Sequence, residues 1–209
     1  MYLIKRFFGK IFFNLFWLPF QLFFRFFLRV EFRYEEDVKK IRLPLIIAVN
    51  HTSWVDPFLA GMVFPFNSVV YPICFAAWHI YYYVGFPFFF VLASFPVKRG
   101  IGLENALKEA VKVLKNRGTV GIFPEGKRRR FGRPRRGRRG VAYLALTTGA
   151  PVMPLKIEGA LGLTFSKFFL RRKKIVVKVG KPFYLPPEMK YPENINEATD
   201  FIMDKLMSQ

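Results

Sequence analysis

Residues 43–57 read LPLIIAVNHTSWVDP, and within this stretch an apolar run passes through a polar loop into the start of a helix. The run at 43–49 has the length of one strand, and an unbroken apolar strand is typical of one that is covered on both faces. Asp56 followed by Pro57 predicts a helix start, with Asp56 as the N-cap and Pro57 in the first helical position. The stretch therefore predicts a buried strand followed by a helix.

The chain repeats this alternation further on. Residues 103–117 place Leu103, Leu107 and Leu114 on one side of an amphipathic helix, and Gly118 follows as the expected C-cap. The other expected elements are a strand at 119–123, a helix at 141–148, strands at 151–157 and 175–179, and a helix at 193–207. Because strands alternate with helices, we expect the α/β class, with a central, mainly parallel sheet flanked by helices.

A long uncharged stretch separates the first strand from these elements. No Asp, Glu, Lys or Arg occurs between Pro57 and Val97. Hydropathy alone leaves two possibilities for part of it, a membrane span or core helices that line an apolar pocket. The residues that break it into short pieces are Pro65, Pro72, Gly85 and Pro87. These breaks favour the core helices.

Residues 1–30 combine many aromatic side chains with regularly spaced polar ones. The polar residues recur in steps of four or seven, so they fall on one narrow stripe of a helix. They are Arg6, Lys10, Asn14, Gln21, Arg25 and Arg29. This pattern predicts a helix that lies in the membrane interface, with a kink or a split at Pro19. A tilted transmembrane anchor is the alternative.

The composition restricts the class of partner. The 209 residues carry a formal net charge of +20 and include 27 Phe. Such a basic chain is expected to meet an anionic partner, either nucleic acid or anionic lipid. The abundance of Phe favours lipid, because nucleic acid does not reward a long apolar stripe. The single cysteine, Cys74, excludes an internal disulfide and is expected to be a packed thiol, since its neighbours are apolar.

Two polar segments are candidates for chemistry. In the first, His51 precedes Asp56 by five residues at the end of the buried strand. If the loop folds back, the carboxylate can hold one imidazole nitrogen while the other takes a proton from an alcohol. The spacing alone also fits a loop histidine and a capping aspartate. The second segment, FPEGKR at 123–128, follows another short strand and by itself also fits a solvated charged turn.

Taken together, the two segments resemble motifs one and three of the glycerolipid acyltransferase family. FPVKR at 95–99 resembles the second motif, and VMPL at 152–155 resembles the fourth. The four segments occur in the order of the family's motifs, and the resemblance covers residues 43–185. It implies an acyltransferase catalytic domain at 34–209, and the aromatic pattern of the N-terminus predicts a membrane-anchoring segment at 1–33.

The resemblance implies a role for each matching residue. His51 would be the general base that deprotonates the acceptor hydroxyl, and Asp56 would orient it. Arg99 and Arg128 would bind the acceptor phosphate, because a guanidinium matches phosphate oxygens. The remaining assignments are Glu125 and Gly126 for the shape of the acceptor site, and the strand containing Pro154 for a wall of the acyl pocket.

The same resemblance implies the substrates. The donor would be acyl-CoA or acyl-carrier protein, and the acceptor a lysophospholipid, most often 1-acylglycerol-3-phosphate, which gives phosphatidic acid. No metal or bound cofactor is expected, and two His and one Cys do not supply a usual zinc site. The enzyme is expected on an anionic lipid surface, at the cytoplasmic face of the inner (plasma) membrane.

Two departures from the family pattern leave the acceptor open. Lys127 stands where the third motif usually has Thr, and residues 74–78 lack a lysine that members often carry. Lys127 is therefore a candidate phosphate contact in its place. A lysophospholipid with a larger headgroup, or an aminolipid, is the alternative acceptor. A basic nucleic-acid-binding module would explain the nine basic residues at 127–139 but neither the paired motifs nor the aromatic N-terminus.

Overall fold

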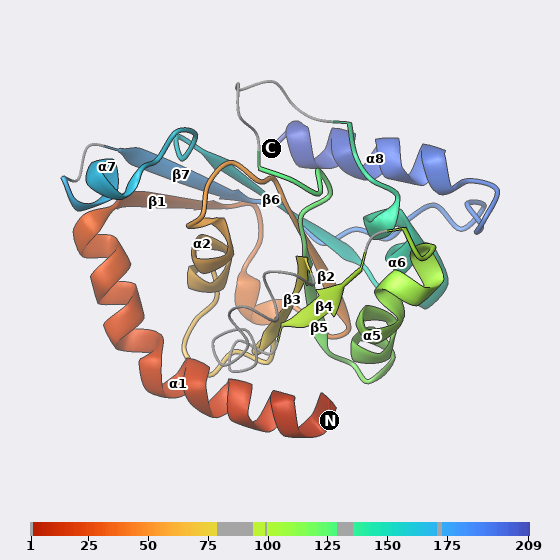
Figure 1. Cartoon of the computed structure of the whole chain (residues 1–209), viewed down its shortest axis with the longest axis horizontal. Coiled ribbons are helices and arrows are strands. Elements are labelled where there is room, and N and C mark those ends of the chain that lie inside the picture. The colour runs from red at the N-terminus through yellow and green to blue at the C-terminus, as the bar shows by residue number, and fades with distance from the viewer. Residues whose placement is uncertain (1, 79–93, 99, 129–135, 171–172) are drawn as a thin grey trace.

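The computed structural model of the chain describes residues 2–78, 94–98, 100–128, 136–170 and 173–209 (Figure 1). The described strands form one seven-stranded sheet in the order β1-β7-β6-β2-β5-β3-β4. Among them, β6 and β7 pair antiparallel and every other neighbouring pair is parallel. The strands are β1 (Arg29–Tyr34), β2 (Leu45–Val49), β3 (Ile73–Trp78), β4 (Phe95–Val97), β5 (Thr119–Ile122), β6 (Val152–Glu158) and β7 (Lys174–Val179). The expected α/β class with a mainly parallel sheet is confirmed.

Helices cover both faces of this sheet. One face carries α1 (Tyr2–Phe27), α2 (Asp56–Met62) and α7 (Phe165–Phe169), and the other carries α5 (Leu103–Lys115), α6 (Gly140–Thr148) and α8 (Ile195–Met207) (Figure 1). A short 3-10 turn, Val38–Lys40, leads into β2. The fold is thus a three-layer arrangement in which the sheet is the middle layer.

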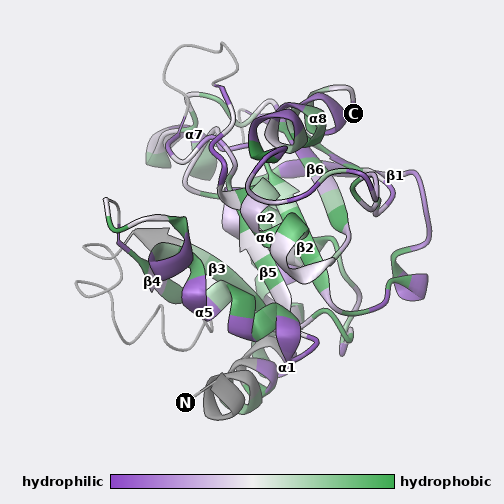
Figure 2. Ribbon diagram, turned by 90° about the vertical axis from the view of Figure 1, so that its right-hand side faces the viewer, coloured by the Kyte–Doolittle hydropathy of each residue, from purple (hydrophilic) through white to green (hydrophobic). Residues whose placement is uncertain are grey.

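The central strand β2 explains why residues 45–49 are apolar without interruption. Its side chains alternate between the two layers: Leu45, Ile47 and Val49 belong to the core beneath α1 and α2, whereas Ile46 and Ala48 belong to the core beneath α5 and α6. All five residues are fully buried. Figure 2 shows the same feature, with the central strands coloured hydrophobic between the helices. The prediction of a strand covered on both faces is confirmed.

Parallel pairing places the sequence motifs at one edge of the sheet. The loop that contains His51 follows the carboxyl end of β2, and the segment at 123–128 follows the carboxyl end of the neighbouring β5. The strand β4, which precedes Lys98, runs in the same direction on the far side of β3. Loops at the carboxyl ends of parallel strands are where such folds bind their ligands.

Several boundaries differ from the sequence-based expectations. In the uncharged stretch, 73–78 is the strand β3 and not a core helix, because it pairs with β5 and supplies an interior position of the sheet. The strands β1 and β4 were not predicted. The C-cap of α5 is Asn116, followed by Arg117 with left-handed backbone (φ 53°), so the expected C-cap at Gly118 is wrong by two positions.

The N-terminal helix α1 is continuous through Pro19, so of the kink or split expected there, the split does not occur. Figure 1 shows that the helix is bent, and a proline within a helix is the usual cause of a bend. The outward face of α1 is apolar. Its exposed large side chains include Phe7, Phe8, Ile11, Leu15, Leu18, Leu22 and Phe26. No helix among the described residues is long and apolar enough to cross a membrane.

The polar stripe of α1 lies differently from the sequence-based expectation. Gln21, in the middle of the stripe, is buried against the domain and not solvated. Its amide donates to the carbonyl of Met62 (3.1 Å), and Asn14 approaches Asn67 across the same interface (3.4 Å). Asn14 and Gln21 therefore lie on the contact between α1 and the domain, whereas Lys10, Arg25 and Arg29 of the same stripe are exposed.

Side-chain donors satisfy four successive carbonyls at the end of α2, where a helix leaves its last carbonyls unpaired. The donor–acceptor pairs are Tyr71 with Gly61 (2.7 Å), Gln21 with Met62 (3.1 Å), Tyr34 with Val63 (3.0 Å) and Trp17 with Phe64 (3.3 Å). Two of these donors come from α1, so α1 is tied to the helix that begins with Asp56. The expected domain boundary at residue 33 falls inside β1, and the segment that precedes the sheet ends with α1.

Candidate active site

The carboxylate of Asp56 is the centre of the site. It is fully buried, at the first turn of α2, and it points back into the loop that precedes the helix. Oδ2 lies 2.9 Å from His51 Nδ1 and accepts from the backbone N–H groups of Thr52 (2.6 Å) and Ser53 (2.7 Å). Oδ1 accepts from the hydroxyls of Thr52 (3.2 Å) and Ser53 (2.9 Å). The loop thus folds back around the carboxylate.

This geometry corrects one expectation. Asp56 is not the N-cap of α2, because Val55 occupies that position and Asp56 is the first helical residue. Its carboxylate accepts hydrogen bonds from donors of the preceding loop and not from the N–H groups of the first helical turn. Pro57 is thus the second helical residue, one position later than expected, and it still lies in the first turn, where its missing N–H leaves no hydrogen bond unmade.

His51 is held on three sides. Nδ1 contacts Asp56, and the backbone N–H donates to Glu125 Oε1 (3.2 Å). The imidazole stacks on the ring of Phe123, with centroids 4.0 Å apart and planes 21° from parallel. The side chain retains 19% exposure. With Nδ1 engaged by the carboxylate, Nε2 is the nitrogen that can take a proton from a substrate.

The FPEGKR segment forms a tight turn beside the histidine. The N–H of Gly126 donates to the carbonyl of Phe123 (2.9 Å), and Gly126 has a φ of +67°. That left-handed conformation favours glycine. A Cβ at this position would also overlap the side chain of Arg138, which packs over the turn. The turn carries Glu125, which is 2% exposed, toward the backbone of His51.

Asn50 is a site residue that the sequence reasoning missed. It follows β2 directly and is 3% exposed. Its side-chain amide donates to the carbonyl of Ile157 (2.9 Å) and accepts from the N–H of the same residue (2.6 Å). The pair extends the β2–β6 pairing one step beyond the strand and fixes the direction in which the chain leaves the sheet. The signal in the sequence was a polar side chain between an apolar strand and the candidate base.

The other expected site residues lie in different places. Lys127 and Arg128 follow the turn and are exposed. Arg99 lies outside the described residues. Pro154 is buried in β6, where it pairs in register with Ala48 and its carbonyl accepts from the N–H of Gly180 (2.9 Å). The structure therefore brings His51, Asp56 and Glu125 together but places Pro154 within the sheet.

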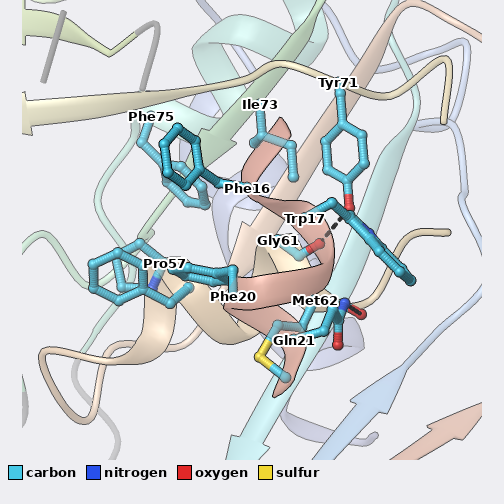
Figure 3. Close-up of a pocket in the computed structure, with 11 residues that line it drawn as sticks. Phe16, Trp17, Phe20, Gln21, Pro57, Gly61, Met62, Tyr71, Ile73 and Phe75 are labelled. Carbon is cyan, nitrogen blue, oxygen red and sulfur yellow. Dashed lines mark hydrogen bonds between the residues drawn. The ribbon is translucent and has the colours of Figure 1, made fainter. Parts of the chain in front are cut away.

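An apolar groove lies next to the site, with a cavity volume of about 60 Å³ (Figure 3). Its walls are Phe16, Trp17, Phe20 and Gln21 from α1, Pro57, Phe58, Gly61 and Met62 from α2, and Tyr71, Ile73 and Phe75. Phe75 stacks on Phe123 (5.6 Å), which stacks on His51, so two rings join the groove to the histidine. Pro154 does not line this groove: its neighbours Met153 and Leu155 belong to the core on the groove side of the sheet, so its side chain points to the other face.

The polar groups of the groove wall are satisfied internally. Burial raises the pKa of the Tyr71 hydroxyl, so it stays protonated and donates to the carbonyl of Gly61 (2.7 Å; Figure 3). Gln21 and Trp17 donate to carbonyls in the same region. The groove therefore presents an apolar lining, which suits a hydrocarbon ligand. Among the described residues, no group of three or more His, Cys, Asp or Glu could hold a metal ion. The expectation that none is required stays a prediction.

Comparison with known proteins decides the family. Residues 29–158 match the family model for Acyltransferase, and this range contains His51, Asp56, Glu125 and Arg128. The chain belongs to the acyltransferase family. The family expected from the paired motifs is therefore confirmed.

Three curated relatives share the name 1-acyl-sn-glycerol-3-phosphate acyltransferase. The acyltransferase described here is 28% identical over 142 residues to the one from Bacillus subtilis (strain 168). The aligned region covers 66% of this chain and 66% of the relative. It is 30% identical over 142 residues to one from Cocos nucifera (66% and 45%). It is 28% identical over 145 residues to one from Borreliella burgdorferi (68% and 53%). The matches thus span from under a half to about two thirds of these relatives.

A solved structure shares the fold. The crystal structure of the 1-acyl-sn-glycerophosphate (LPA) acyltransferase PlsC from Thermotoga maritima superposes with a TM-score of 0.62 and 23% sequence identity. The match covers 90% of this chain and 77% of the other. The family model matches residues 29–158, whereas the shared fold covers nearly the whole chain.

The Asp56 contacts generate a prediction about stability. Asp56→Asn replaces one carboxylate oxygen, which accepts hydrogen bonds, by an NH2 group, which donates them. The NH2 group would then face the buried donors of residues 51–53, and those donors would lose their acceptor. We expect a loss of about 3 kcal/mol in the free energy of unfolding, measured by urea denaturation. Asp204→Asn, at an exposed position of α8, is the matched control and should change it by less than about 0.5 kcal/mol. Equal effects of the two substitutions would contradict this account of the loop.

Proposed function

We propose that this acyltransferase moves a fatty acyl group from acyl-CoA or acyl-carrier protein to the free hydroxyl of 1-acylglycerol-3-phosphate, giving phosphatidic acid. The observation that carries the proposal is the contact of His51 Nδ1 with the buried carboxylate of Asp56, beside an apolar groove. The names of the three curated relatives support the choice of acceptor.

The proposed chemistry is a direct transfer. Nε2 of His51 takes the proton from the acceptor hydroxyl while the oxygen attacks the thioester carbonyl carbon. The C–O bond forms, the tetrahedral intermediate collapses, and the C–S bond breaks. The thiolate leaves and receives the proton from the imidazolium. Asp56 holds the ring in the tautomer with Nδ1 protonated and stabilises the imidazolium that forms during attack.

The acceptor phosphate is proposed to bind the basic residues that follow β4 and β5. Arg128 and Lys127 are exposed directly after the turn that holds Glu125. In the sequence, Arg99 is the second residue after the end of β4. A planar guanidinium can pair with two phosphate oxygens at once. In this proposal Glu125 shapes the site indirectly, because its carboxylate fixes the backbone of His51.

The acyl chain of the donor is proposed to occupy the groove between α1, α2 and β3. The groove is lined almost wholly by apolar side chains, and Phe75 and Phe123 connect it to His51. A thioester carbonyl next to Nε2 would then leave its hydrocarbon tail in apolar surroundings. The groove lies on the face of the sheet opposite the side chain of Pro154, so the acyl-pocket role expected of the strand that contains Pro154 stays a prediction.

The protein is proposed to work on a membrane surface at the cytoplasmic face. Its acceptor is a membrane lipid, and the outward side of α1 is a continuous row of apolar side chains. A helix with such a face lies in the interface between lipid and water. Labelling of cysteines introduced at the exposed positions Lys40 and Lys127 in intact cells would test this topology. The two positions lie before and after the uncharged stretch, and both must react from the same side.

The role of His51 can be tested directly. His51→Ala should lower kcat by about 100-fold to 10,000-fold while the folded structure persists, because the general base is removed and the side chain is partly exposed. The measurement is transfer of radiolabelled acyl groups, with circular dichroism as the check on folding. His51→Gln, which keeps polarity and size but cannot act as a base near neutral pH, should be equally inactive. A folded variant with near-normal turnover would overturn the mechanism.

Acceptor binding depends on Arg128 in this proposal. Arg128→Ala should raise the KM for the lysophospholipid by about tenfold or more and leave the KM for the donor nearly unchanged. Arg128→Lys should restore part of the loss, because it keeps the charge without the paired donors. Arg42→Ala is the control, since Arg42 is exposed before β2, at the opposite end of that strand from His51. An effect on the donor alone would refute the phosphate assignment.

The groove assignment predicts a change in acyl-chain preference. Phe20→Ala enlarges the groove and should shift the relative kcat/KM toward longer or bulkier acyl donors by about tenfold, measured at a fixed acceptor. Phe32→Ala, which removes a ring of the same size that does not line the groove, should leave the preference unchanged. If both variants show the same donor ranking as the wild type, the acyl chain lies elsewhere.

A further inference from the structure

The short helix α7 exposes an unusual amount of apolar surface. Phe165 is 66% exposed, Phe169 is 54% exposed and Leu170, directly after the helix, is 59% exposed. Three large apolar side chains on so few residues form a small protruding patch. Isolated exposed apolar residues need no explanation, but a contiguous group marks a surface that contacts something other than water.

The patch stands on a rigid base. Phe168, in the middle of α7, is 1% exposed and packs against the rings of Phe24 (5.7 Å) and Phe27 (5.2 Å) of α1. It also contacts Trp54, which lies in the loop between His51 and Asp56 (5.3 Å). The side chain of Thr164 caps the helix by accepting from the N–H of Lys167 (3.3 Å). One aromatic side chain therefore anchors α7, and the exposed ones on either side remain outward.

The patch is continuous with the outward face of α1. Phe169 contacts Phe27 (5.0 Å), which in turn contacts the exposed Phe23 (4.9 Å) and Phe26 (5.0 Å). Figure 1 shows α7 beside the end of α1 on the same side of the molecule. The two helices thus form one aromatic surface, although residues 27 and 165 are far apart in the sequence.

We propose that α7 is a second lipid-contacting element, whose side chains at 165, 169 and 170 enter an anionic bilayer surface alongside α1. The inference rests on the proposed function, because it takes the lipid acceptor to be presented in a membrane. It goes further by placing the membrane contact next to the His51 loop as well as along α1.

The charges around α7 select an anionic bilayer as the occupant. Lys167 is exposed on the helix, and Lys173 follows it nearby. Their ammonium groups donate to the backbone carbonyls of Gly162 (3.4 Å) and Leu161 (3.2 Å), which orient the charges without neutralising them. A second copy of this chain would bring the same positive charges together, and the net charge of +20 makes that unfavourable. Basic and aromatic side chains on one surface are the composition that anionic lipid attracts.

This contact would place the membrane next to the chemistry. Phe165 stacks on Trp54, with ring centroids 4.7 Å apart, and Trp54 belongs to the loop that wraps Asp56. If Phe165 enters a bilayer, only its own ring separates the bilayer from Trp54 in the loop that carries His51. An acceptor lipid would move only a short way out of the membrane to reach the base.

The first experiment labels α7 directly. The native Cys74 is buried, so a cysteine introduced as Phe169→Cys can be labelled with an environment-sensitive fluorophore. Addition of vesicles of phosphatidylglycerol should raise the fluorescence several-fold and shift the emission to the blue. Tyr184→Cys, labelled in the same way at an exposed aromatic position away from α7, should show no such change. A label at position 169 that stays in water while the protein binds vesicles would overturn the inference.

The second experiment measures binding by vesicle flotation. Phe165→Ser/Phe169→Ser should weaken partition into phosphatidylglycerol vesicles by about tenfold, and Tyr184→Ser should not change it. Lys167→Gln should weaken binding to phosphatidylglycerol but not to phosphatidylcholine vesicles. Both altered phenylalanines are more than half exposed, so the double variant should keep the wild-type melting temperature. A double variant that binds vesicles like the wild type would also overturn the inference.

The outcomes separate this inference from the proposed function. On a short-chain, water-soluble lysolipid the double variant should transfer acyl groups at the wild-type rate, whereas on vesicle-borne acceptor it should be slower. Loss of transfer on both acceptors would assign α7 to the fold or the chemistry and overturn its role as a lipid contact. A wild type that transfers acyl groups but binds neither kind of vesicle would overturn the membrane contact and leave the chemistry standing. A dimer that the double variant disrupts would show that a second copy covers the patch.

Discussion

The structure of the candidate site depends on the burial of one carboxylate. Asp56 is fully buried, and a buried charge is tolerated only when hydrogen bonds replace the water that it has lost. Two backbone N–H groups, two hydroxyls and one imidazole nitrogen surround it. Because all of these donors come from the residues between His51 and Ser53, the loop has little freedom to place them elsewhere. The position of the imidazole is thus a consequence of solvating the carboxylate.

The sheet restricts the same loop from the other side. Asn50 joins the backbone of Ile157 through two hydrogen bonds, so the chain leaves β2 in a fixed direction. Glu125, which follows the neighbouring strand β5, accepts from the N–H of His51. Three strands, β2, β5 and β6, therefore contribute to the placement of one side chain. Parallel pairing makes this possible, since the carboxyl ends of β2, β5 and β6 lie at one edge.

Local patterns predicted much of the fold. The apolar run at 45–49, the amphipathic spacing of α5 and the strand before Phe123 each follow from side-chain periodicity, and each is present in the structure. The strand β3 was missed because an aromatic-rich run without polar residues has no period to distinguish strand from helix. The C-cap of α5 was misplaced because Arg117, a side chain that rarely adopts positive φ, takes the left-handed position.

The candidate site was predictable only in part. The spacing of His51 and Asp56 indicated a contact, and the structure places their atoms 2.9 Å apart. The contact between Glu125 and the backbone of His51 was not predictable, since it joins residues 74 positions apart through the sheet. The placement of the Pro154 side chain was not predictable for a related reason, and the substrate-binding role expected of Pro154 stays a prediction. Which face of a strand a side chain occupies is set by register, and the motif around residue 154 does not specify the register of β6 with β2.

The polar residues of α1 show how one sequence pattern can serve two surfaces. A stripe of polar side chains on an aromatic helix suggests contact with water. Gln21 of the stripe and Trp17, one turn before it, donate instead to the carbonyls of Met62 and Phe64 at the end of α2. Those carbonyls have lost their helical partners, so the donors are needed where they are. Gln21, Trp17 and the buried Phe24 hold one side of α1 against the domain, so the row of large apolar side chains on the opposite side faces outward. The same contact makes α1 one wall of the groove beside His51. The helix is therefore part of the candidate active site, and any surface that receives its apolar face is held in a fixed relation to the groove.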